Sequence, residues 1–249
     1  MDVTAIRSLA DSAITFDLDD KPGARAAARV RGAVTAINAW IVDNALGQTV
    51  EVVGAFASIT VHYDPLRSAQ ADLVEAVIML LANTAPTENV TTRLWRLPCC
   101  YDGAHGADLV DLAVRLNLPQ EQIIARHKAC IFDVFAMGFL PGLPFMGELP
   151  GALSLPRRSS PRQLVPKGSV AIANGLCIIY PGASPGGWHI IGHCPVALFD
   201  VHRDTPALLT PGDQVQFEYV TLEQHHQIEA DLAHGTIAPH DYLKSRSVA

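Results

Sequence analysis

Several signals that would place a chain in a common functional class are missing from this sequence. No stretch of its 249 residues approaches the uninterrupted apolar length of a membrane-spanning helix, and the N-terminus has no basic segment followed by a long apolar run. The G-x-x-x-x-G-K-[ST] spacing of a nucleotide-binding loop is also missing. We therefore expect a cytoplasmic protein that does not hydrolyse ATP by itself.

Positive charge is scarce as well. Lysine and arginine number 18 against 25 aspartate and glutamate residues, which gives a formal net charge of −7. A general surface for nucleic acid or anionic membranes needs the opposite balance. We expect neither among the partners, whereas the 49% of hydrophobic residues is ample for a folded, globular protein.

Cysteine is too sparse and too irregular for a disulfide framework or a zinc site. The cysteines form an odd set without C-x-x-C spacing, namely Cys99, Cys100, Cys130, Cys177 and Cys194. Most of them lie in apolar runs, where free thiols behave as small hydrophobic side chains. A nucleophilic role for Cys177 or Cys194 would need a histidine base and a lowered pKa, so we expect core thiols.

Glycine and proline, by contrast, are concentrated in one place. Residues 138–192 contain ten of the 18 glycines and eight of the 17 prolines. Prolines fix φ, and glycines permit close approaches and unusual backbone angles, so this density predicts rigid loops of defined shape. Such loops usually recognise a ligand or a partner.

Residues 1–88 are expected to form a small α/β domain. Ile14, Phe16 and Leu18 alternate with polar residues as in a half-buried strand, and a second strand is expected over 59–63. Apolar spacings of three and four predict amphipathic helices over 27–41 and 73–81. The polar, proline-bearing segment 85–89 marks the expected domain boundary.

Residues 89–220 are expected to form a second, β-rich domain. A first strand over 92–101 and helices over 107–116 and 119–127 precede a series of short apolar runs, at 130–137, 170–173, 177–180, 188–191, 196–199 and 215–220. Glycine or proline between these runs suggests a β-barrel, so the predicted fold class is α+β. Residues 221–249 are polar and are expected to form a C-terminal extension with a surface helix.

Two patterns resemble catalytic or metal motifs but lack their context. Ser184 lies in a G-x-S-x-G string, yet Pro185 has no N–H for an oxyanion hole and a strand is expected to follow. His189 and His193 would lie about 13 Å apart along an extended strand, too far to share a metal. We expect no serine-hydrolase elbow here.

The C-terminal histidines give a similarly ambiguous signal. His225, His226 and Glu229 could approach one another on a helix, but a solvated helix face explains them as well. We expect no metal site.

Four cations, Arg157, Arg158, Arg162 and Lys167, lie within eleven residues of this acidic chain. Guanidinium groups suit carboxylates and phosphates, so the cluster predicts either an anionic ligand or carboxylates of the same fold as its partners. Arg162 is the preferred anion contact. Trp188 and Phe139 line a ligand pocket in one interpretation and close the barrel core in the other.

The loop motifs resemble one known family, variously called the B subunit of 5-oxoprolinase (PxpB), KipI or allophanate hydrolase subunit 1. The motifs that carry the resemblance are Leu97-Pro98, Tyr101, Asp108-Leu109, Gly138-Phe139-Leu140-Pro141-Gly142, Pro156-Arg157-Arg158, Pro161-Arg162, Val165-Pro166, Gly168-Ser169-Val170, Tyr180-Pro181, Ser184-Pro185-Gly186-Gly187-Trp188, Ile191-Gly192, Leu198-Phe199-Asp200 and Pro211-Gly212-Asp213. The resemblance is dense over 97–220 and weaker before that.

The resemblance implies a small α/β domain followed by a cyclophilin-like β-barrel. The partners that it implies are the homologous C subunit of the complex and its A subunit. The implied complex is a 5-oxoprolinase, which uses ATP to convert 5-oxo-L-proline to L-glutamate. The substrate is a small anionic amide. No cofactor is expected to be bound by this chain. The implied substrate-binding residues are Phe139, Pro141, Gly142, Arg157, Arg162, Lys167, Ser169, Tyr180, Gly186, Gly187 and Trp188. No catalytic group is assigned.

Departures from the family pattern leave the substrate open. Leu143 stands where an aromatic residue commonly follows the glycine, Phe145-Met146 replaces a tyrosine-leucine pair, and Cys194 replaces a threonine. Two alternatives therefore remain, a carboxyltransferase component of a urea carboxylase or allophanate pathway, which would need biotin from another chain, and a KipI-like inhibitor of a histidine kinase.

Overall fold

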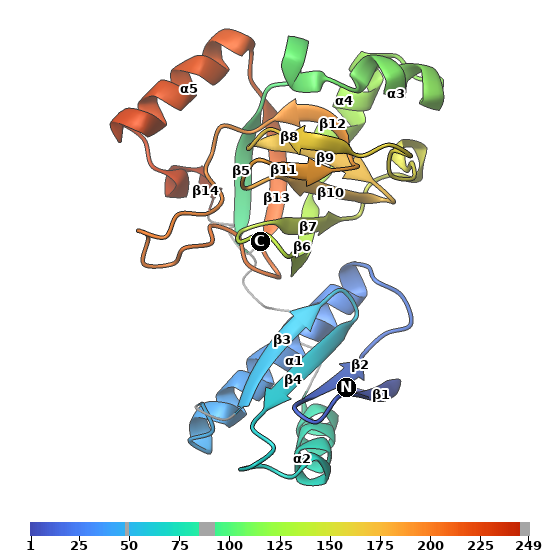
Figure 1. Cartoon of the computed structure of the whole chain (residues 1–249), viewed down its shortest axis with the longest axis vertical. Coiled ribbons are helices and arrows are strands. Elements are labelled where there is room, and N and C mark those ends of the chain that lie inside the picture. The colour runs from blue at the N-terminus through green and yellow to red at the C-terminus, as the bar shows by residue number, and fades with distance from the viewer. Residues whose placement is uncertain (48–49, 85–92, 245–249) are drawn as a thin grey trace. The chain divides into compact units, whose positions relative to one another are not determined.

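The computed structural model describes residues 1–47, 50–84 and 93–244 (Figure 1). The chain divides into two compact units, Met1–Val90 and Thr91–Ala249, and each has its own hydrophobic core. The boundary predicted at 85–89 lies outside the described residues.

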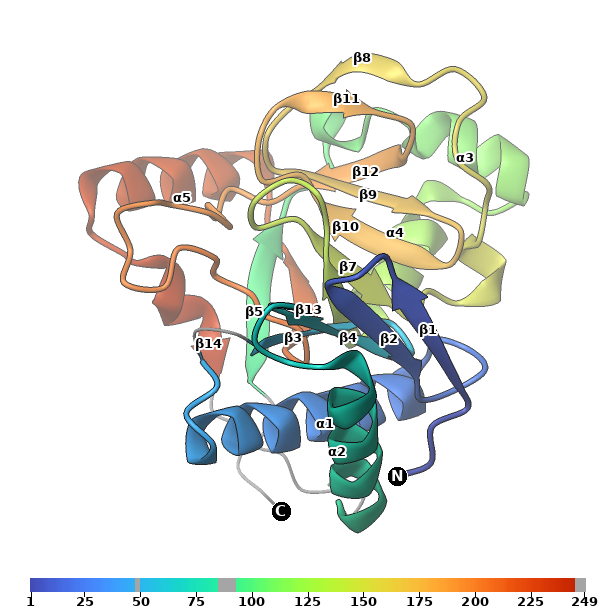
Figure 2. The ribbon, with the colours of Figure 1, turned by 60° about the horizontal axis from the view of Figure 1, so that its bottom comes forward.

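The N-terminal unit is a four-stranded antiparallel sheet with two helices. Its elements are β1 (Ala5–Leu9), β2 (Ala13–Asp17), α1 (Ala24–Asp43), β3 (Val50–Ala55), β4 (Ser58–Tyr63) and α2 (Gln70–Asn83). The strand order is β1-β2-β4-β3. Figure 2 shows both helices on the same face of this sheet, where the apolar stripe of each helix is buried.

The two helices and the strands β2 and β4 are where the sequence predicts them, whereas β1 and β3 were not predicted. Every residue of β1 is exposed, so no alternation of buried and exposed positions marks it in the sequence. In β3, buried Val50 and Val52 alternate with Glu51 and with an exposed Val53, which weakens the period-two pattern.

The C-terminal unit is built on an eight-stranded mixed sheet. The strands of this unit are β5 (Leu94–Cys99), β6 (Phe132–Met137), β7 (Pro144–Gly147), β8 (Arg162–Val165), β9 (Ser169–Ala173), β10 (Leu176–Ile179), β11 (Ser184–Gly186), β12 (His189–His193), β13 (Gln214–Tyr219) and β14 (Leu243–Lys244). The order in the sheet is β12-β9-β10-β7-β6-β13-β5-β14, and β8 pairs with β11 as a separate ribbon. Strands β5 and β13 are parallel to each other.

The predicted cyclophilin-like barrel is not confirmed. Among the described residues the strands do not pair into a complete ring, and a single bridge between Cys100 and His193 joins the end of β5 to β12. This bridge consists of two backbone hydrogen bonds, of 2.9 and 2.8 Å. The unit is therefore a mixed α/β structure with one large sheet.

The helices of this unit are α3 (Leu109–Leu116), α4 (Gln120–Ala129) and α5 (Leu222–His234), with the 3₁₀ turns η1 (Gly103–Gly106), η2 (Gly151–Leu153) and η3 (Pro239–Tyr242). They confirm the helices predicted over 107–116 and 119–127. Over the described part of the chain, no helix has the length and apolar content that crossing a membrane needs.

The strand predicted over 196–199 is wrong. Val196 and Leu198 are buried and alternate with half-exposed neighbours, but this loop makes only one isolated bridge, between Phe199 and Ala207. The alternation reflects loop side chains that pack on the core, not a paired strand.

The C-terminal segment is more than the expected surface extension. Helix α5 forms as predicted, but β14 pairs with β5, and Leu232, Tyr242 and Leu243 pack against the main core of the unit. His225 is fully buried. The segment therefore completes one edge of the sheet.

Helix α5 begins with a capping box. The Thr221 hydroxyl oxygen accepts the N–H of Gln224 at 3.2 Å, and the Gln224 side-chain oxygen accepts the N–H of Thr221 at 2.9 Å. We expect Thr221→Ala to lower the free energy of unfolding of this unit by about 1 kcal/mol, because a helix N–H loses its acceptor. Urea denaturation would measure this, with exposed Thr205→Ala as the control. Equal midpoints for the two variants would contradict a stabilising cap.

Candidate functional site

Residues 157–167, which contain the four cations, are called the basic loop, and a buried carboxylate at the start of α3 holds this loop in place. The Asp108 side chain is only 4% exposed, and it accepts hydrogen bonds from Arg158 at 3.0 Å and from the backbone N–H of Ile190 at 2.6 Å. Arg162 donates to both carboxylate oxygens, at 2.6 and 3.0 Å. Paired, charge-assisted hydrogen bonds of this kind are strong and fix the position of the guanidinium relative to the carboxylate. Arg158 and Arg162 thus have a carboxylate of the same fold as partner, one of the two outcomes that the sequence left open.

Arg157 and Lys167 are the exposed cations of the basic loop. No carboxylate among the described residues lies within ion-pairing distance of either group. The Arg157 guanidinium lies 5.5 Å from the ring centroid of Trp188, a cation–π contact. These two residues have no carboxylate partner, whereas Arg158 and Arg162 share one carboxylate and keep one net positive charge between them; a contact of Arg162 with an anion therefore stays a prediction.

Trp188 and Phe139 differ in their exposure. Trp188 is 5% exposed and packs against Phe145 with the ring centroids 5.9 Å apart, in a small core that also contains Tyr180 and Ile190. Phe139 is 83% exposed in its loop. Trp188 therefore has a core position, while contact of Phe139 or Trp188 with a ligand stays a prediction.

The glycines of the 186–188 segment allow close packing around Tyr180. A Cβ on Gly186 would lie 2.2 Å from the Tyr180 hydroxyl oxygen, so only glycine fits there. The carbonyl of Gly187 accepts the N–H of Arg158 at 2.7 Å, which ties the basic loop to this segment. The pKa of Tyr180 is raised, mainly by burial, so its hydroxyl stays neutral.

A pocket of about 300 Å³ brings two of the predicted residues, Lys167 and Tyr180, together with residues that were not predicted. Its lining is Lys167, Gly168, Tyr180, Pro181, His193, Cys194, Pro195, Val196, Leu198 and Glu229. Predicted Ser169 is buried opposite His193 in the β9–β12 register. Gly168 has φ +81°, and a Cβ there would meet the carbonyl oxygen of Cys194 at 2.6 Å, so this wall also requires glycine.

The predicted residues Pro141 and Gly142 lie outside this pocket lining. They belong to the turn in which the N–H of Gly138 donates to the carbonyl of Leu143 at 2.8 Å. Gly142 lies against the backbone of Leu198, where a Cβ would be 3.0 Å from the carbonyl oxygen. Because Leu198 lines the pocket, this turn packs against one of the residues that form the pocket.

Three histidines from separate elements meet beside the pocket. His105 of η1, His193 at the end of β12 and His225 of α5 have ring centroids 4.5 to 4.8 Å apart. The pKa values of all three histidines are lowered, mainly by burial, and the pKa of His225 falls to about 4. The expectation that His225 lies on a solvated helix face is wrong. No local spacing could have revealed this cluster, because only the fold brings the three segments together.

The cysteines are core thiols, as predicted for Cys177 and Cys194. The described structure contains no disulfide, and four of the five cysteines are buried. Cys177 does have a histidine neighbour, since its sulfur lies 3.3 Å from Nε2 of His127. Burial raises the pKa of Cys177 well above its usual value, so this pair has neither a thiolate nor access to substrate.

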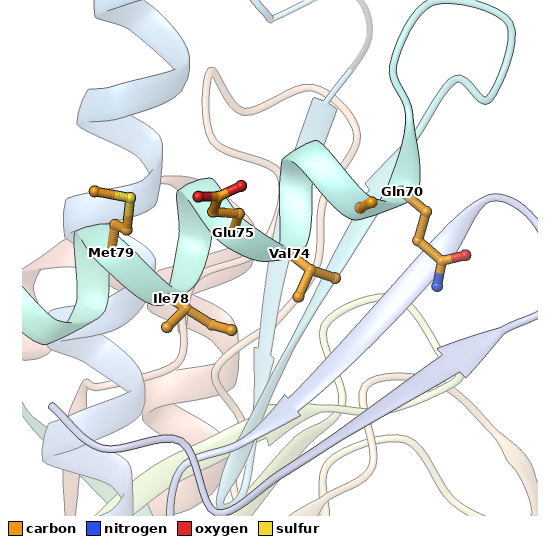
Figure 3. Close-up of a pocket in the computed structure, with 6 residues that line it drawn as sticks. Gln70, Val74, Glu75, Ile78 and Met79 are labelled. Atoms are coloured by element: carbon orange, nitrogen blue, oxygen red, sulfur yellow. The ribbon is translucent and has the colours of Figure 1, made fainter.

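A second hollow lies on the N-terminal unit (Figure 3). It is lined by one face of α2 alone, namely Gln70, Ala71, Val74, Glu75, Ile78 and Met79. The amide of Gln70 donates to the hydroxyl of Ser8. The hollow gathers no convergent polar groups, so the pocket beside the histidines is the better candidate site.

Comparison with known proteins identifies the family to which the chain belongs. Residues 4–209 match the family model of the carboxyltransferase domain, subdomains C and D. The chain belongs to this family. The histidine cluster extends beyond the matched part, because His225 lies C-terminal to it.

Individual members of the family cover most of the chain. It is 34% identical over 235 residues to the B subunit of 5-oxoprolinase from Bacillus subtilis (strain 168), and the match spans 89% of this chain and 95% of that protein. The crystal structure of TTHA0988 superposes with a TM-score of 0.72 at 33% identity, over 87% of this chain. The aligned part is 40% of the TTHA0988 chain. The urea carboxylase of Kluyveromyces lactis has the same fold at 19% identity, with a TM-score of 0.72 over 94% of this chain and 23% of that one.

Proposed function

We propose that this chain is the B subunit of a 5-oxoprolinase that converts 5-oxo-L-proline to L-glutamate with the use of ATP. It acts with the A and C subunits of that complex and is inactive alone. The observation that carries the proposal is the 34% identity to the B subunit of the Bacillus subtilis 5-oxoprolinase, which extends over almost the full length of both proteins. The likeness to urea carboxylase concerns the fold alone and does not favour a carboxylase in the same way.

The pocket chemistry supports a small anionic substrate. 5-Oxoproline carries one carboxylate and one ring amide. Lys167 is an exposed cation at the rim of a pocket whose other lining is largely apolar, apart from the neutral Tyr180 hydroxyl, His193 and Glu229. A lysine ammonium provides a charge-assisted hydrogen bond for a carboxylate, while Arg158 and Arg162 position the loop through Asp108.

The proposal is tested by producing this chain with the candidate A and C subunits encoded beside it. We expect glutamate release from 5-oxoproline only when ATP and all three chains are present. A stable complex without turnover would redirect the proposal to another amide or to urea. If no complex forms, the proposed 5-oxoprolinase role is wrong and a KipI-like inhibitor becomes the better hypothesis.

The charge of Lys167 is expected to act on substrate binding. A charge-assisted hydrogen bond contributes about 1.5–3 kcal/mol, so Lys167→Ala should lower kcat/KM of the complex by roughly 10- to 100-fold, mainly through a higher KM. Arg126→Ala, which removes an exposed cation from α4, is the matched control and should leave both constants unchanged. If the two variants have equal KM values, Lys167 does not contact the substrate.

A further inference from the structure

The histidine cluster, His105, His193 and His225, has the composition of a metal site. One potential ligand nitrogen from each ring lies within 4.8 Å of those of the other two. His225 is fully buried and the other two rings are half-buried. Imidazole nitrogens are the preferred ligands of Zn²⁺ and of neighbouring divalent transition metals.

The hydrogen bonds define which ring nitrogens carry hydrogen. Nε2 of His193 lies 2.8 Å from the carbonyl oxygen of Lys167, and because a carbonyl only accepts, Nε2 is the donor. In the neutral ring, Nδ1 of His193 is then an acceptor, and Nε2 of His225 at 2.7 Å donates to it.

This assignment leaves one buried nitrogen unsatisfied. Nδ1 of His225 has no hydrogen-bond partner among the described residues, although it is buried. The nearest carboxylate oxygen, Oε2 of Glu229, lies 3.5 Å away and is also an acceptor. Two acceptors that face each other form no hydrogen bond. A buried polar atom without a hydrogen-bond partner is rare in folded proteins and calls for an explanation.

We propose that His105, His193 and His225 bind one divalent transition-metal ion of the Zn²⁺ class, and that Glu229 is the outer-shell partner of His225. When the ion binds, the hydrogen on Nε2 of His225 is replaced by the metal, and the ring is protonated at Nδ1 instead. That new N–H donates to Glu229, so the orphan is satisfied and the neutral ring releases no net proton.

The outer-shell contacts fit this assignment. A metal-bound histidine almost always donates its other ring N–H to a carboxylate or a backbone carbonyl. The Lys167 carbonyl already receives the Nε2–H of His193, and Glu229 is placed to receive the Nδ1–H of His225.

Metal binding would change the distances between the ligand nitrogens by up to about 1.5 Å, since all of them lie within 4.8 Å of one another. With Zn–N bonds of about 2.0–2.1 Å in a tetrahedral site, ligand nitrogens are roughly 3.3–3.4 Å apart. The His193–His225 pair, at 2.7 Å, would open by about 0.6 Å. Three protein ligands leave a fourth position for water or another ligand. The pocket borders this position, because His193 and Glu229 also line it.

A second trio, His225, His226 and Glu229, also has ligand atoms within 4.8 Å of one another. Its residues come from one turn of α5, and His226 and Glu229 are exposed. A metal site at this second trio would leave the hydrogen bond between His193 and the Lys167 carbonyl without a role, so we prefer the trio from three elements.

The proposal is independent of the oxoprolinase activity.

The test uses the untagged full chain after treatment with EDTA and dialysis. Calorimetric titration with Zn²⁺ is expected to show one ion per chain, and Co²⁺ is expected to give the visible absorption of a tetrahedral nitrogen site. Glu229→Gln should weaken binding by roughly 10- to 100-fold, as loss of an outer-shell partner does, and His105→Ala should weaken it more. His234→Ala, an exposed histidine of the same helix, is the matched control and should bind like the wild type.

A spectroscopic measurement keeps the proposal falsifiable if a variant folds poorly. Long-range ¹H–¹⁵N correlation spectra of the wild-type imidazoles should show His225 protonated at Nε2 without metal and at Nδ1 with Zn²⁺. The proposal is wrong if no ion binds at stoichiometric concentration or if the His225 tautomer does not change. It is also wrong if His226→Ala weakens binding while folded His105→Ala does not.

Discussion

Asp108→Asn is expected to lower the free energy of unfolding of the C-terminal unit by about 3 kcal/mol. Asp108 is 4% exposed and has two arginine partners whose side chains are 30% and 25% exposed. Removal of one side of a buried ion pair typically costs 3–5 kcal/mol, because the remaining charge is left without a partner. The partial exposure of the arginines places our estimate at the lower end, about 3 kcal/mol.

The measurement is urea denaturation followed by tryptophan fluorescence in a Trp40→Phe background. In that background Trp95 and Trp188, both in the C-terminal unit, are the remaining tryptophans. Asp111→Asn is the matched control, since Asp111 lies on the same helix but is 54% exposed in its pair with Arg115, and should change stability by less than about 0.5 kcal/mol. Equal effects of the two substitutions would show that Asp108 does not hold the basic loop.

Amphipathic helices and buried strands could be predicted from the sequence because one face of each is apolar. Helices α1 to α3 and strands such as β4 and β13 follow this rule. The exposed edge strand β1 has no buried face, and β14 has only two residues, so neither leaves a pattern. The closure of the sheet depends on pairing between distant segments, which periodicity does not encode.

The candidate site was predicted in part for the same reason. Density of glycine, proline and cations located the loops, and Lys167 and Tyr180 do line the pocket. The partner of Arg162 could not be predicted, because Asp108 is 54 positions away and the pairing exists only once α3 and β12 are in place. Charge density in sequence therefore shows where cations lie, but not which of them already have a carboxylate partner in the fold.

The histidines show this limit most clearly. His105, His193 and His225 lie on three elements, and each alone resembles an ordinary surface or strand residue. The bridge between Cys100 and His193 fixes the end of β12 near η1, which accounts for the contact between His193 and His105 but not for that with His225. A site of this kind is a product of tertiary structure, and its donor set becomes visible only through hydrogen-bond directions.

Acid is expected to destabilise the C-terminal unit through His127. This ring is fully buried against Phe132 and Phe217, its Nδ1 lies 2.9 Å from the Tyr101 hydroxyl, and burial lowers its pKa to about 3. The unfolded chain binds a proton at this residue below about pH 6.5, whereas the folded chain does not until near pH 3. Stability is therefore lost as pH falls through this window, by up to about 1.4 kcal/mol per pH unit.

His127→Gln removes this linkage and should make the loss of stability between about pH 6 and pH 4 smaller by about 2–3 kcal/mol, even if the variant is less stable at neutral pH. Denaturation in urea and EDTA at several pH values, again in the Trp40→Phe background, measures the slope. His202→Gln, in an exposed loop, is the control and should retain the wild-type slope. Because other buried histidines contribute equally to both proteins, the difference between the slopes isolates His127. Identical slopes for wild type and His127→Gln would mean that the ring is protonated in the folded state, and that its contacts with Tyr101 and Cys177 rearrange in acid.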